Sequence, residues 1–341
     1  RKRSDQVLPI LKKVHVLVME LERTPTHPPA ASNHPPTGGV NLRRSGTDSL
    51  TRVESARKHA TLRSKRLVPL QSGSCPLQSG SCPKATTMIN LRSDTVTRPT
   101  DAMYRAMAEA EVGDDYYRQD RTVIALEEKA AELFGKEAAM YLFSATMGNL
   151  VSILSHAKRG ESLILEERSH IYNNEAGGLA ALAGLTPRTI EGERGRMSPE
   201  QIEAAVFPPA VLHPQTSLLC LENTHNAAGG VCLSVEQTKS LTDTARSCGL
   251  KIHLDGARIF NSAVGQGVSP EDLTREVDSV TVCLTKGLGC PVGALVLGGA
   301  NFVADARRWR QAVGGGMRQA GVVAAAGIVA LDTMVDRLAE D

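Results

Sequence analysis

The chain has 341 residues with a formal net charge of +2, and 41% of them are hydrophobic, which is enough to bury the core of one large domain or two ordinary ones. No apolar run reaches the roughly 18 residues of a membrane span, so a membrane protein is not expected. The seven cysteines are odd in number, and their spacings suit neither a zinc site nor a disulfide framework. We therefore expect buried thiols in a reducing compartment and no metal.

Residues 1–87 differ from the rest of the chain in charge and composition. They carry 15 Lys and Arg against 5 Asp and Glu, whereas residues 88–341 carry 24 against 32. Residues 25–40 are rich in proline and glycine, and the segment 69–75 is repeated directly as 76–82. Such sequence predicts a disordered, low-complexity leader. We expect a cytoplasmic protein; a mitochondrial one is the alternative if the basic leader is a transit peptide. Charge alone does not make nucleic acid an expected partner.

From Met88 onwards the chain alternates between helical and strand patterns. Residues 122–135 have the apolar spacing of one helix face. Uninterrupted apolar runs of strand length follow, at residues 138–143, 162–165, 217–221, 251–254, 279–284 and 292–297, and helical stretches lie between several of them, at 147–157, 198–206 and 235–248. This alternation predicts an α/β domain over residues 88–341, with a mostly parallel sheet covered by helices on both faces. Such sheets bind ligands at the carboxyl ends of their strands.

Two charged residues follow predicted strands and are candidates for chemistry. Lys286 comes after the run 279–284 and is flanked by Gly287 and Gly289. A lysine at the end of a buried strand can act as a nucleophile when burial lowers its pKa, although most lysines there are solvated. Asp255 ends the run 251–254, where a carboxylate needs a cationic partner. Arg258 is one candidate for that partner, and a protonated pyridine nitrogen is the other.

Three further features lie at predicted strand ends. The turn of residues 143–149 contains Ala145 and Thr146, and its hydroxyls and free N–H groups suit a phosphate, although plain N-capping explains them as well. His170 and His225 can each stack on a ring or act as a base, and either can also be a structural histidine. Phosphate turn, histidine, aspartate and lysine occur in the order found in pyridoxal-phosphate enzymes of the aspartate-aminotransferase fold.

Several segments resemble threonine aldolases more specifically. They are N-L-R-S-D-T-V-T-R-P-T at 90–100, V-G-D-D-Y-Y at 112–117, L-E-N-T-H-N at 221–226, H-L-D-G-A-R at 253–258, L-T-K-G-L-G at 284–289 and G-G-G-M-R-Q at 314–319. The resemblance covers the chain from Met88 to its end. It implies the pyridoxal-phosphate-dependent transferase fold and a carbon–carbon lyase that cleaves L-threonine or L-allo-threonine to glycine and acetaldehyde.

The resemblance also implies a role for each matching residue. Lys286 would form the Schiff base with pyridoxal phosphate, and Asp255 would keep the pyridine nitrogen protonated. His170 would stack on the ring and lie near the substrate hydroxyl, which His225 would approach from the other side. The catalytic base is then His170, His225 or an ordered water.

Other matching residues would bind the phosphate and the substrate carboxylate. Ala145, Thr146 and the neighbouring backbone would hold the phosphate, although the family usually has glycine at the position of Ala145. Arg318 would reach the phosphate of a neighbouring subunit in a homodimer or homotetramer. Ser93 and Arg258 would orient the carboxylate of the β-hydroxy amino acid, a task that suits the planar guanidinium.

Two alternatives to a working threonine aldolase stay open. Lysine and aspartate serve related enzymes equally, so a serine hydroxymethyltransferase-like enzyme, a β-eliminating lyase or an aminotransferase is possible. The family also continues into a small C-terminal domain that supplies another carboxylate-binding arginine. Because this chain ends at Asp341, we expect that domain to be missing, and a non-catalytic fragment is the second alternative.

Overall fold

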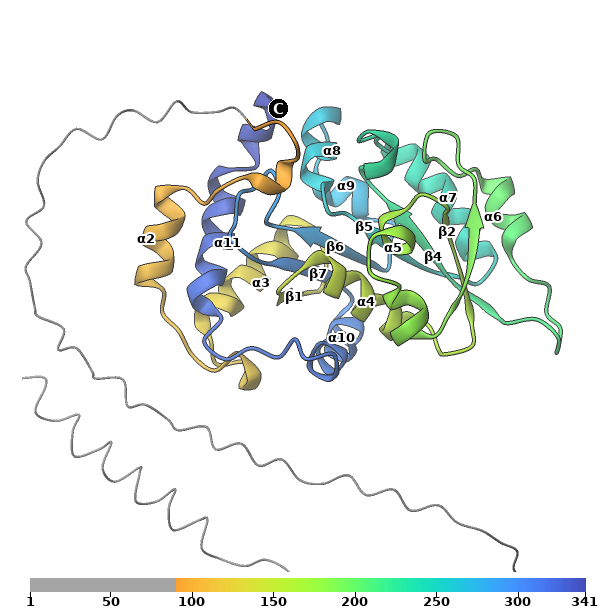
Figure 1. The fold of residues 1–341 in the computed structure, drawn as a ribbon, viewed down its shortest axis with the longest axis horizontal. Coiled ribbons are helices and arrows are strands. Elements are labelled where there is room, and N and C mark those ends of the chain that lie inside the picture. The colour runs from red at the N-terminus through yellow and green to blue at the C-terminus, as the bar shows by residue number, and fades with distance from the viewer. Residues whose placement is uncertain (1–89) are drawn as a thin grey trace, which may run out of the picture. The chain divides into compact units, whose positions relative to one another are not determined.

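A computed structural model describes residues 90–341, and Figure 1 shows how their helices and strands are arranged. The leader predicted over residues 1–87 lies outside the described residues. Within the described part, seven strands form one sheet in the order β1-β7-β6-β5-β4-β2-β3. Their bounds are β1 (Ala138–Leu142), β2 (Ser162–Glu166), β3 (Thr186–Ile190), β4 (Thr216–Glu222), β5 (Lys251–Asp255), β6 (Ser279–Cys283) and β7 (Ala294–Gly298).

The sheet is mostly parallel, as the sequence predicts. Strand β7 runs antiparallel to both of its neighbours, β1 and β6, and every other neighbouring pair is parallel. Strands β1 and β6 therefore point the same way as β2, β4 and β5, and their carboxyl ends share one edge. The predicted α/β fold with a mostly parallel sheet is confirmed.

Ten α-helices connect and cover the strands in the described residues, and five helical turns of the 3-10 or π type complete this part of the chain. The α-helices are α2 (Asp101–Glu109), α3 (Arg121–Leu133), α4 (Ala145–His156), α5 (His170–Asn173), α6 (Pro199–Ala205), α7 (Val235–Ser247), α8 (Ile259–Gln266), α9 (Pro270–Thr274), α10 (Ala300–Ala312) and α11 (Gly321–Thr333). The other turns are η1 (Asp94–Val96), η2 (Asp115–Tyr117), η3 (Leu179–Ala183), η4 (Asn226–Ala228) and η5 (Asp336–Glu340). None of the described helices is long and apolar enough to cross a membrane.

Polar caps fix where several helices begin. The side chain of Asp120 accepts a hydrogen bond from the N–H of Val123 at the start of α3. Ser198 and Ser234 open α6 and α7 with capping boxes, in which each serine and the glutamine three residues later bond to each other's backbone. These caps satisfy N–H groups that a helix start otherwise leaves unpaired, so each helix begins at its capping residue.

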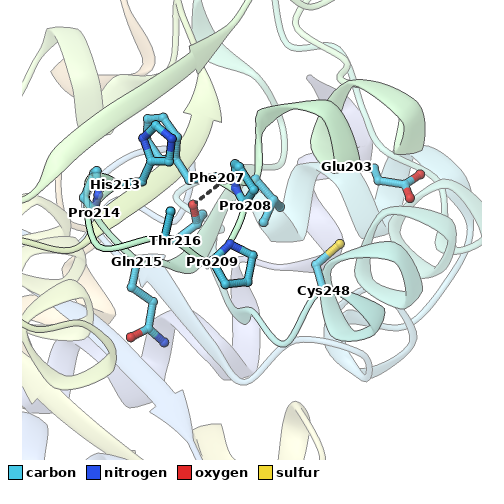
Figure 2. A pocket seen from close by; sticks show the side chains of 11 residues that line it. Glu203, Phe207, Pro208, Pro209, His213, Pro214, Gln215, Thr216 and Cys248 are labelled. Carbon is cyan, nitrogen blue, oxygen red and sulfur yellow. Dashed lines mark hydrogen bonds between the residues drawn. The ribbon is translucent and has the colours of Figure 1, made fainter.

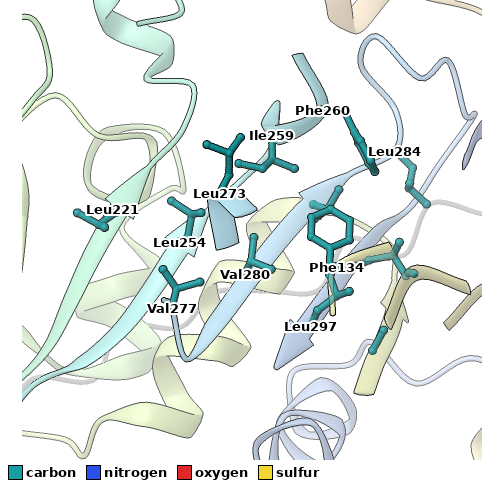
Figure 3. Packing of buried hydrophobic residues seen from close by; sticks show 14 of the residues in the cluster. Phe134, Leu221, Leu254, Ile259, Phe260, Leu273, Val277, Val280, Leu284 and Leu297 are labelled. Carbon is teal, nitrogen blue, oxygen red and sulfur yellow. The ribbon is translucent and has the colours of Figure 1, made fainter. Parts of the chain in front are cut away.

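Side chains alternate across the sheet and give it two buried faces. On β4, Leu219 and Leu221 pack in the core that α2, α3, α7, α8, α9 and α11 cover, whereas Leu218 and Cys220 face α4, α5 and η3. Figure 3 shows the first of these cores, where residues of β5, β6 and β7 meet α8 and the end of α3. The rings of Phe134 and Phe260 meet there edge to face, with centroids 5.4 Å apart.

The order of the strands predicts where a ligand binds. From β2 the chain moves outward to β3, and from β4 it moves the other way through β5 and β6, so the direction reverses between β2 and β4. Ligands of open α/β sheets bind at such a switch point, outside the carboxyl ends of the strands. Glu166, Glu222 and Asp255 are the last residues of β2, β4 and β5, and all three are buried at this edge.

Candidate active site

Lys286 lies three residues beyond β6, in a loop that glycine allows to pack closely. Its carbonyl oxygen accepts hydrogen bonds from the Thr97 hydroxyl at 2.8 Å and from the N–H of Gly289 at 2.9 Å. Gly289 has a φ of +75°, and a side chain there would start 3.3 Å from the carbonyl oxygen of Arg98. A side chain on Gly287 would start 2.7 Å from Leu338. The two glycines therefore let the lysine-bearing loop sit against residues 97–98 and η5, which holds Lys286 at the end of β6.

Asp255 is a buried carboxylate that has hydrogen-bond donors but no cation. It is 2% exposed at the end of β5. One oxygen accepts a hydrogen bond from the amide nitrogen of Asn149 at 2.8 Å, and the other accepts the N–H of Ala257 at 3.1 Å. Among the described residues, no lysine, arginine or histidine forms an ion pair with it. The structural Asp255–Arg258 pair, one of the two sequence alternatives, is therefore wrong.

Arg258 pairs instead with Asp94, which no sequence argument singled out. The guanidinium donates from Nε at 2.6 Å and from Nη2 at 2.9 Å to the two carboxylate oxygens. Burial acts to raise the pKa of Asp94, but the hydrogen bonds and charge of Arg258, with the charge of Lys286, hold it below the usual value. Ser93 caps η1 directly beside this pair. The structure thus brings Ser93, Arg258 and Lys286 to one side of the site.

The turn after β1 has the features of an anion site and of a capped helix. Ser144 accepts a hydrogen bond from the N–H of Met147 at 3.2 Å, so the N-cap that explains this motif is present. The N–H groups of Ala145 and Thr146 begin α4, and within residues 90–341 neither donates to a protein acceptor. The methyl group of Ala145 packs against the cluster of Met140 and its neighbours on this face of the sheet. Both sequence interpretations of the turn therefore remain compatible with the structure.

His170 opens α5 beside the buried carboxylates. Its Nδ1 lies 3.0 Å from Oε1 of Glu175, and its backbone N–H donates to Glu222 at 2.7 Å. The hydrogen bond to Glu175 raises the pKa of His170, against an opposing effect of burial. One ligand atom each of His170, Glu175 and Asp255 lie within 4.8 Å of one another. The structure thus places His170 next to Asp255, and its place near a cofactor ring, which the resemblance implies, stays a prediction.

His225 lies at the same edge of the sheet, but its ring is enclosed. It is 2% exposed, and its Nε2 is 2.9 Å from Oε2 of Glu166. Its Nδ1 is buried without a hydrogen-bond partner in the described chain. Gly195, with a φ of +80°, covers the ring so closely that a side chain on it would start 2.6 Å from the imidazole. Access to a substrate hydroxyl is therefore greater for His170 than for His225.

Arg318 does not meet the other candidates within this chain. Its guanidinium donates to Asp114 at 2.8 Å and lies over the ring of Tyr116, 4.5 Å from the centroid. Its carbonyl oxygen accepts the N–H of Asp115 at 3.0 Å. The V-G-D-D-Y-Y segment is therefore the support of Arg318, and the guanidinium remains exposed.

Five residues of the site escaped sequence reasoning: Asp94, Asn149, Glu166, Glu175 and Glu222. A usable signal was present for Glu166 and Glu222, because β2 and β4 are apolar strands that end in an acidic residue, as β5 does. Figure 2 shows a pocket at the opposite edge of the sheet, where β4 begins. The stacked rings of Phe207 and His213 line it, and none of the site residues does.

Comparisons with known proteins identify the family of the chain. Residues 90–341 match the beta-eliminating lyase family. The chain is 48% identical to low-specificity L-threonine aldolase 1 of Arabidopsis thaliana over 257 residues, 74% of this chain and 72% of that protein. It is also 48% identical to the low specificity L-threonine aldolase of Escherichia coli (strain K12) over 255 residues, 74% of this chain and 76% of that protein. The chain belongs to the beta-eliminating lyase family.

The fold of the family is found in solved structures as well. The structure of Leishmania major threonine aldolase aligns with a TM-score of 0.65 at 20% identity, covering 73% of this chain and 74% of that one. The resemblance predicted from six motifs is thereby confirmed, and so is the classification as a threonine aldolase, a carbon–carbon lyase. The beta-eliminating lyases depend on pyridoxal phosphate. Asp255 fits that cofactor, because a buried carboxylate without a cation matches a protonated ring nitrogen.

Proposed function

We propose that this chain cleaves L-threonine and L-allo-threonine to glycine and acetaldehyde, with pyridoxal phosphate held by residues of the large domain, 88–341. The observation that carries the proposal is Asp255, a buried carboxylate whose protein partners are neutral donors. The adjacent strand, β6, leads to Lys286. A buried carboxylate and an amine on neighbouring strands are what a pyridinium aldehyde needs at its two ends.

The remaining contacts to the cofactor follow from the positions described above. Lys286 would bind the aldehyde carbon, and Asp255 would face the ring nitrogen. The unpaired N–H groups of Ala145 and Thr146 would receive the phosphate at the start of α4. His170 would stack on the ring. When bound, the cofactor supplies an electron sink for the pair that leaves with the broken Cα–Cβ bond.

Arg258 and Ser93 would bind the carboxylate of the substrate. Asp94 occupies Nε and Nη2 of the guanidinium, whereas Nη1 donates to no acceptor in the described residues. The Asp94 pair therefore fixes the plane of Arg258 and leaves an edge for the substrate. A fixed carboxylate determines which bond at Cα lies perpendicular to the cofactor plane, and so selects the bond to Cβ for cleavage.

His170 is the base that the geometry favours. Because its Nδ1 is hydrogen-bonded to Glu175, the neutral ring carries its proton there and presents Nε2 as an acceptor. Nε2 would take the proton of the β-hydroxyl as the Cα–Cβ bond breaks. The hydroxyl carbon then becomes the carbonyl carbon of acetaldehyde, and a proton returned to Cα completes glycine.

The test is acetaldehyde release from L-threonine by the purified chain with added pyridoxal phosphate. Lys286→Ala should abolish release, whereas Lys251→Ala removes an exposed lysine at the far end of β5 and should retain it. Equal release by Lys286→Ala would contradict the role of the lysine. A keto acid without acetaldehyde would identify an aminotransferase instead.

We also propose that the active form is a homodimer in which Arg318 reaches the phosphate bound by its partner. This rests on the exposure of the guanidinium, 57% of whose side chain is accessible, and on its contacts with Asp114 and Tyr116 rather than with the site. Equilibrium sedimentation tests the assembly, and an active monomer would refute it.

A further inference from the structure

Asn149 is the centre of a hydrogen-bond network beneath the site. It is fully buried on α4, and its amide nitrogen donates to Asp255 and to Glu175, at 2.8 Å in each case. Its amide oxygen lies 3.1 Å from Nε2 of His253, which is also fully buried. Asn149 therefore joins the carboxylate of Asp255 to a histidine that has no role in the reaction described above.

The network continues through the sheet and away from the site. Nδ1 of His253 lies 2.8 Å from the hydroxyl oxygen of Ser279, the first residue of β6. The same hydroxyl oxygen lies 2.7 Å from Nε2 of His156, the last residue of α4. His253 belongs to β5, two residues before Asp255. Four side chains thus link Asp255 to the opposite edge of the sheet.

The direction of every hydrogen bond in this network can be assigned. The nitrogen of Asn149 must face the two carboxylates, because an amide oxygen there would be repelled, so both of its hydrogens are donated. The amide oxygen then accepts Nε2–H of His253. Burial lowers the pKa of His253 to about 3, so its ring is neutral and Nδ1 is an acceptor. The Ser279 hydroxyl donates to that Nδ1 and accepts Nε2–H of His156.

We propose that Asn149, His253 and Ser279 are positioning residues that fix the carboxylate of Asp255 against the ring nitrogen of the cofactor. The inference rests on the proposed function, since it needs Asp255 to face that nitrogen. Along the path from His156 through Ser279, His253 and Asn149, each residue donates to the next one toward Asp255, and aligned hydrogen bonds strengthen one another in a buried site. The oxygen bonded to Asn149 has no other protein donor in the described residues, so rotation of the carboxylate depends on this contact.

A first experiment needs no variant and no cofactor. Nitrogen NMR of the full chain without cofactor reports which ring nitrogen of a neutral histidine carries the proton. The assigned directions require the Nε2–H form of His253, and observation of that form would support the proposed network. The Nδ1–H form would overturn the proposal, because Asn149 would then have no donor for its oxygen. A protonated ring at neutral pH would overturn it as well, because Nδ1 could then not accept the hydrogen bond of the Ser279 hydroxyl.

A second experiment compares the affinity of the chain for pyridoxal phosphate and for its analogue with carbon in place of the ring nitrogen. Ser279→Ala should lower the affinity for pyridoxal phosphate about fivefold, the usual effect of one buried hydrogen bond, and leave the affinity for the analogue unchanged. His253→Leu should act in the same way. Ser162→Ala is the matched control, because Ser162 is also a fully buried first residue of a strand and its hydroxyl bonds, within residues 90–341, to the Thr216 hydroxyl alone.

The outcomes separate this inference from the proposed function. Asp255→Ala should lower the affinity for pyridoxal phosphate far more than the affinity for the analogue. If it does not, both the proposed function and the positioning inference are refuted. If Asp255→Ala discriminates but Ser279→Ala and His253→Leu weaken both ligands equally, the proposed function stands and the positioning chain is refuted. Selective loss in those two variants, without loss in Ser162→Ala, supports it.

Discussion

The contact between α4 and the sheet can be tested by a single methyl group. Gly148 lies on α4 between the turn that opens the helix and Asn149, and a side chain there would start 2.8 Å from the methyl group of Thr281 and 3.1 Å from Val296. Because real side chains essentially never approach so closely, Gly148→Ala must push α4 away from β6 and β7. The same helix carries Asn149 and the turn proposed to hold the phosphate, so the displacement should weaken cofactor binding.

The magnitude follows from two opposing effects. Alanine favours a helix over glycine by about 0.5–1 kcal/mol, whereas overpacking a filled core costs about 1–3 kcal/mol. Gly265 on α8 offers a matched control, since a side chain there meets no atom within 4 Å. Gly265→Ala should therefore stabilise the chain by alanine's helix preference over glycine alone, about 0.5–1 kcal/mol. The difference between the two variants, about 1–3 kcal/mol, is the packing term.

The assay is urea unfolding of both variants without cofactor, followed by titration with pyridoxal phosphate. Gly148→Ala should unfold at lower urea than Gly265→Ala and bind the cofactor more weakly. Equal stability of the two variants would refute the close contact between α4 and the sheet. Lower stability with unchanged cofactor affinity would refute the claim that α4 positions the binding groups.

Three further predictions concern the site itself. The hydrogen bond to Glu175 holds the pKa of His170 above its usual value, and a base works when neutral, so Glu175→Gln should move the acidic limb of the rate profile to lower pH; an unmoved limb contradicts this base. Mixing inactive Arg318→Ala and Lys286→Ala subunits should restore up to about a quarter of the sites if the arginine acts across a dimer, and none if it acts within its own chain. Gly195→Ala, at a φ of +80°, should strain the loop over the buried imidazole and cost at least about 1 kcal/mol in thermal unfolding.

Six of the seven strands could be predicted from apolar runs, and the seventh could not. Strand β3 reads T-P-R-T-I and is mostly accessible, because it is the edge strand beside β2 and has only one neighbour. An edge position tolerates Pro187, which lacks an N–H, and does not require apolar side chains on both faces. The five interior strands are buried on both faces, and so is most of β1 at the other edge of the sheet, and this burial is why their sequences identify them.

The positions of the site residues were predictable, whereas their pairings were not. A strand end is a local property, so Asp255 and Lys286 could be placed from the sequence alone. The partner of Arg258 is 164 residues away, at Asp94, and Asn149 bridges to carboxylates 26 and 106 residues further along the chain. Only the packing of α4 and η1 against the sheet creates these contacts. The choice between a structural and a cofactor-facing Asp255 therefore needed the fold.

The four buried acids at this edge explain why Asp255 is the one suited to a cationic ligand. Glu166 and Glu175 each have a histidine partner, and Glu222 accepts two backbone N–H groups. Burial raises the pKa of Glu175 and of Glu222. These two side chains therefore take up a proton more readily, which lowers the cost of burying their negative charge. Asp255 has neutral donors at both oxygens, which stabilise a negative charge without cancelling it. The described chain supplies no cation at this point, and the proposed ring nitrogen would supply one, so cofactor binding should raise the stability of the fold.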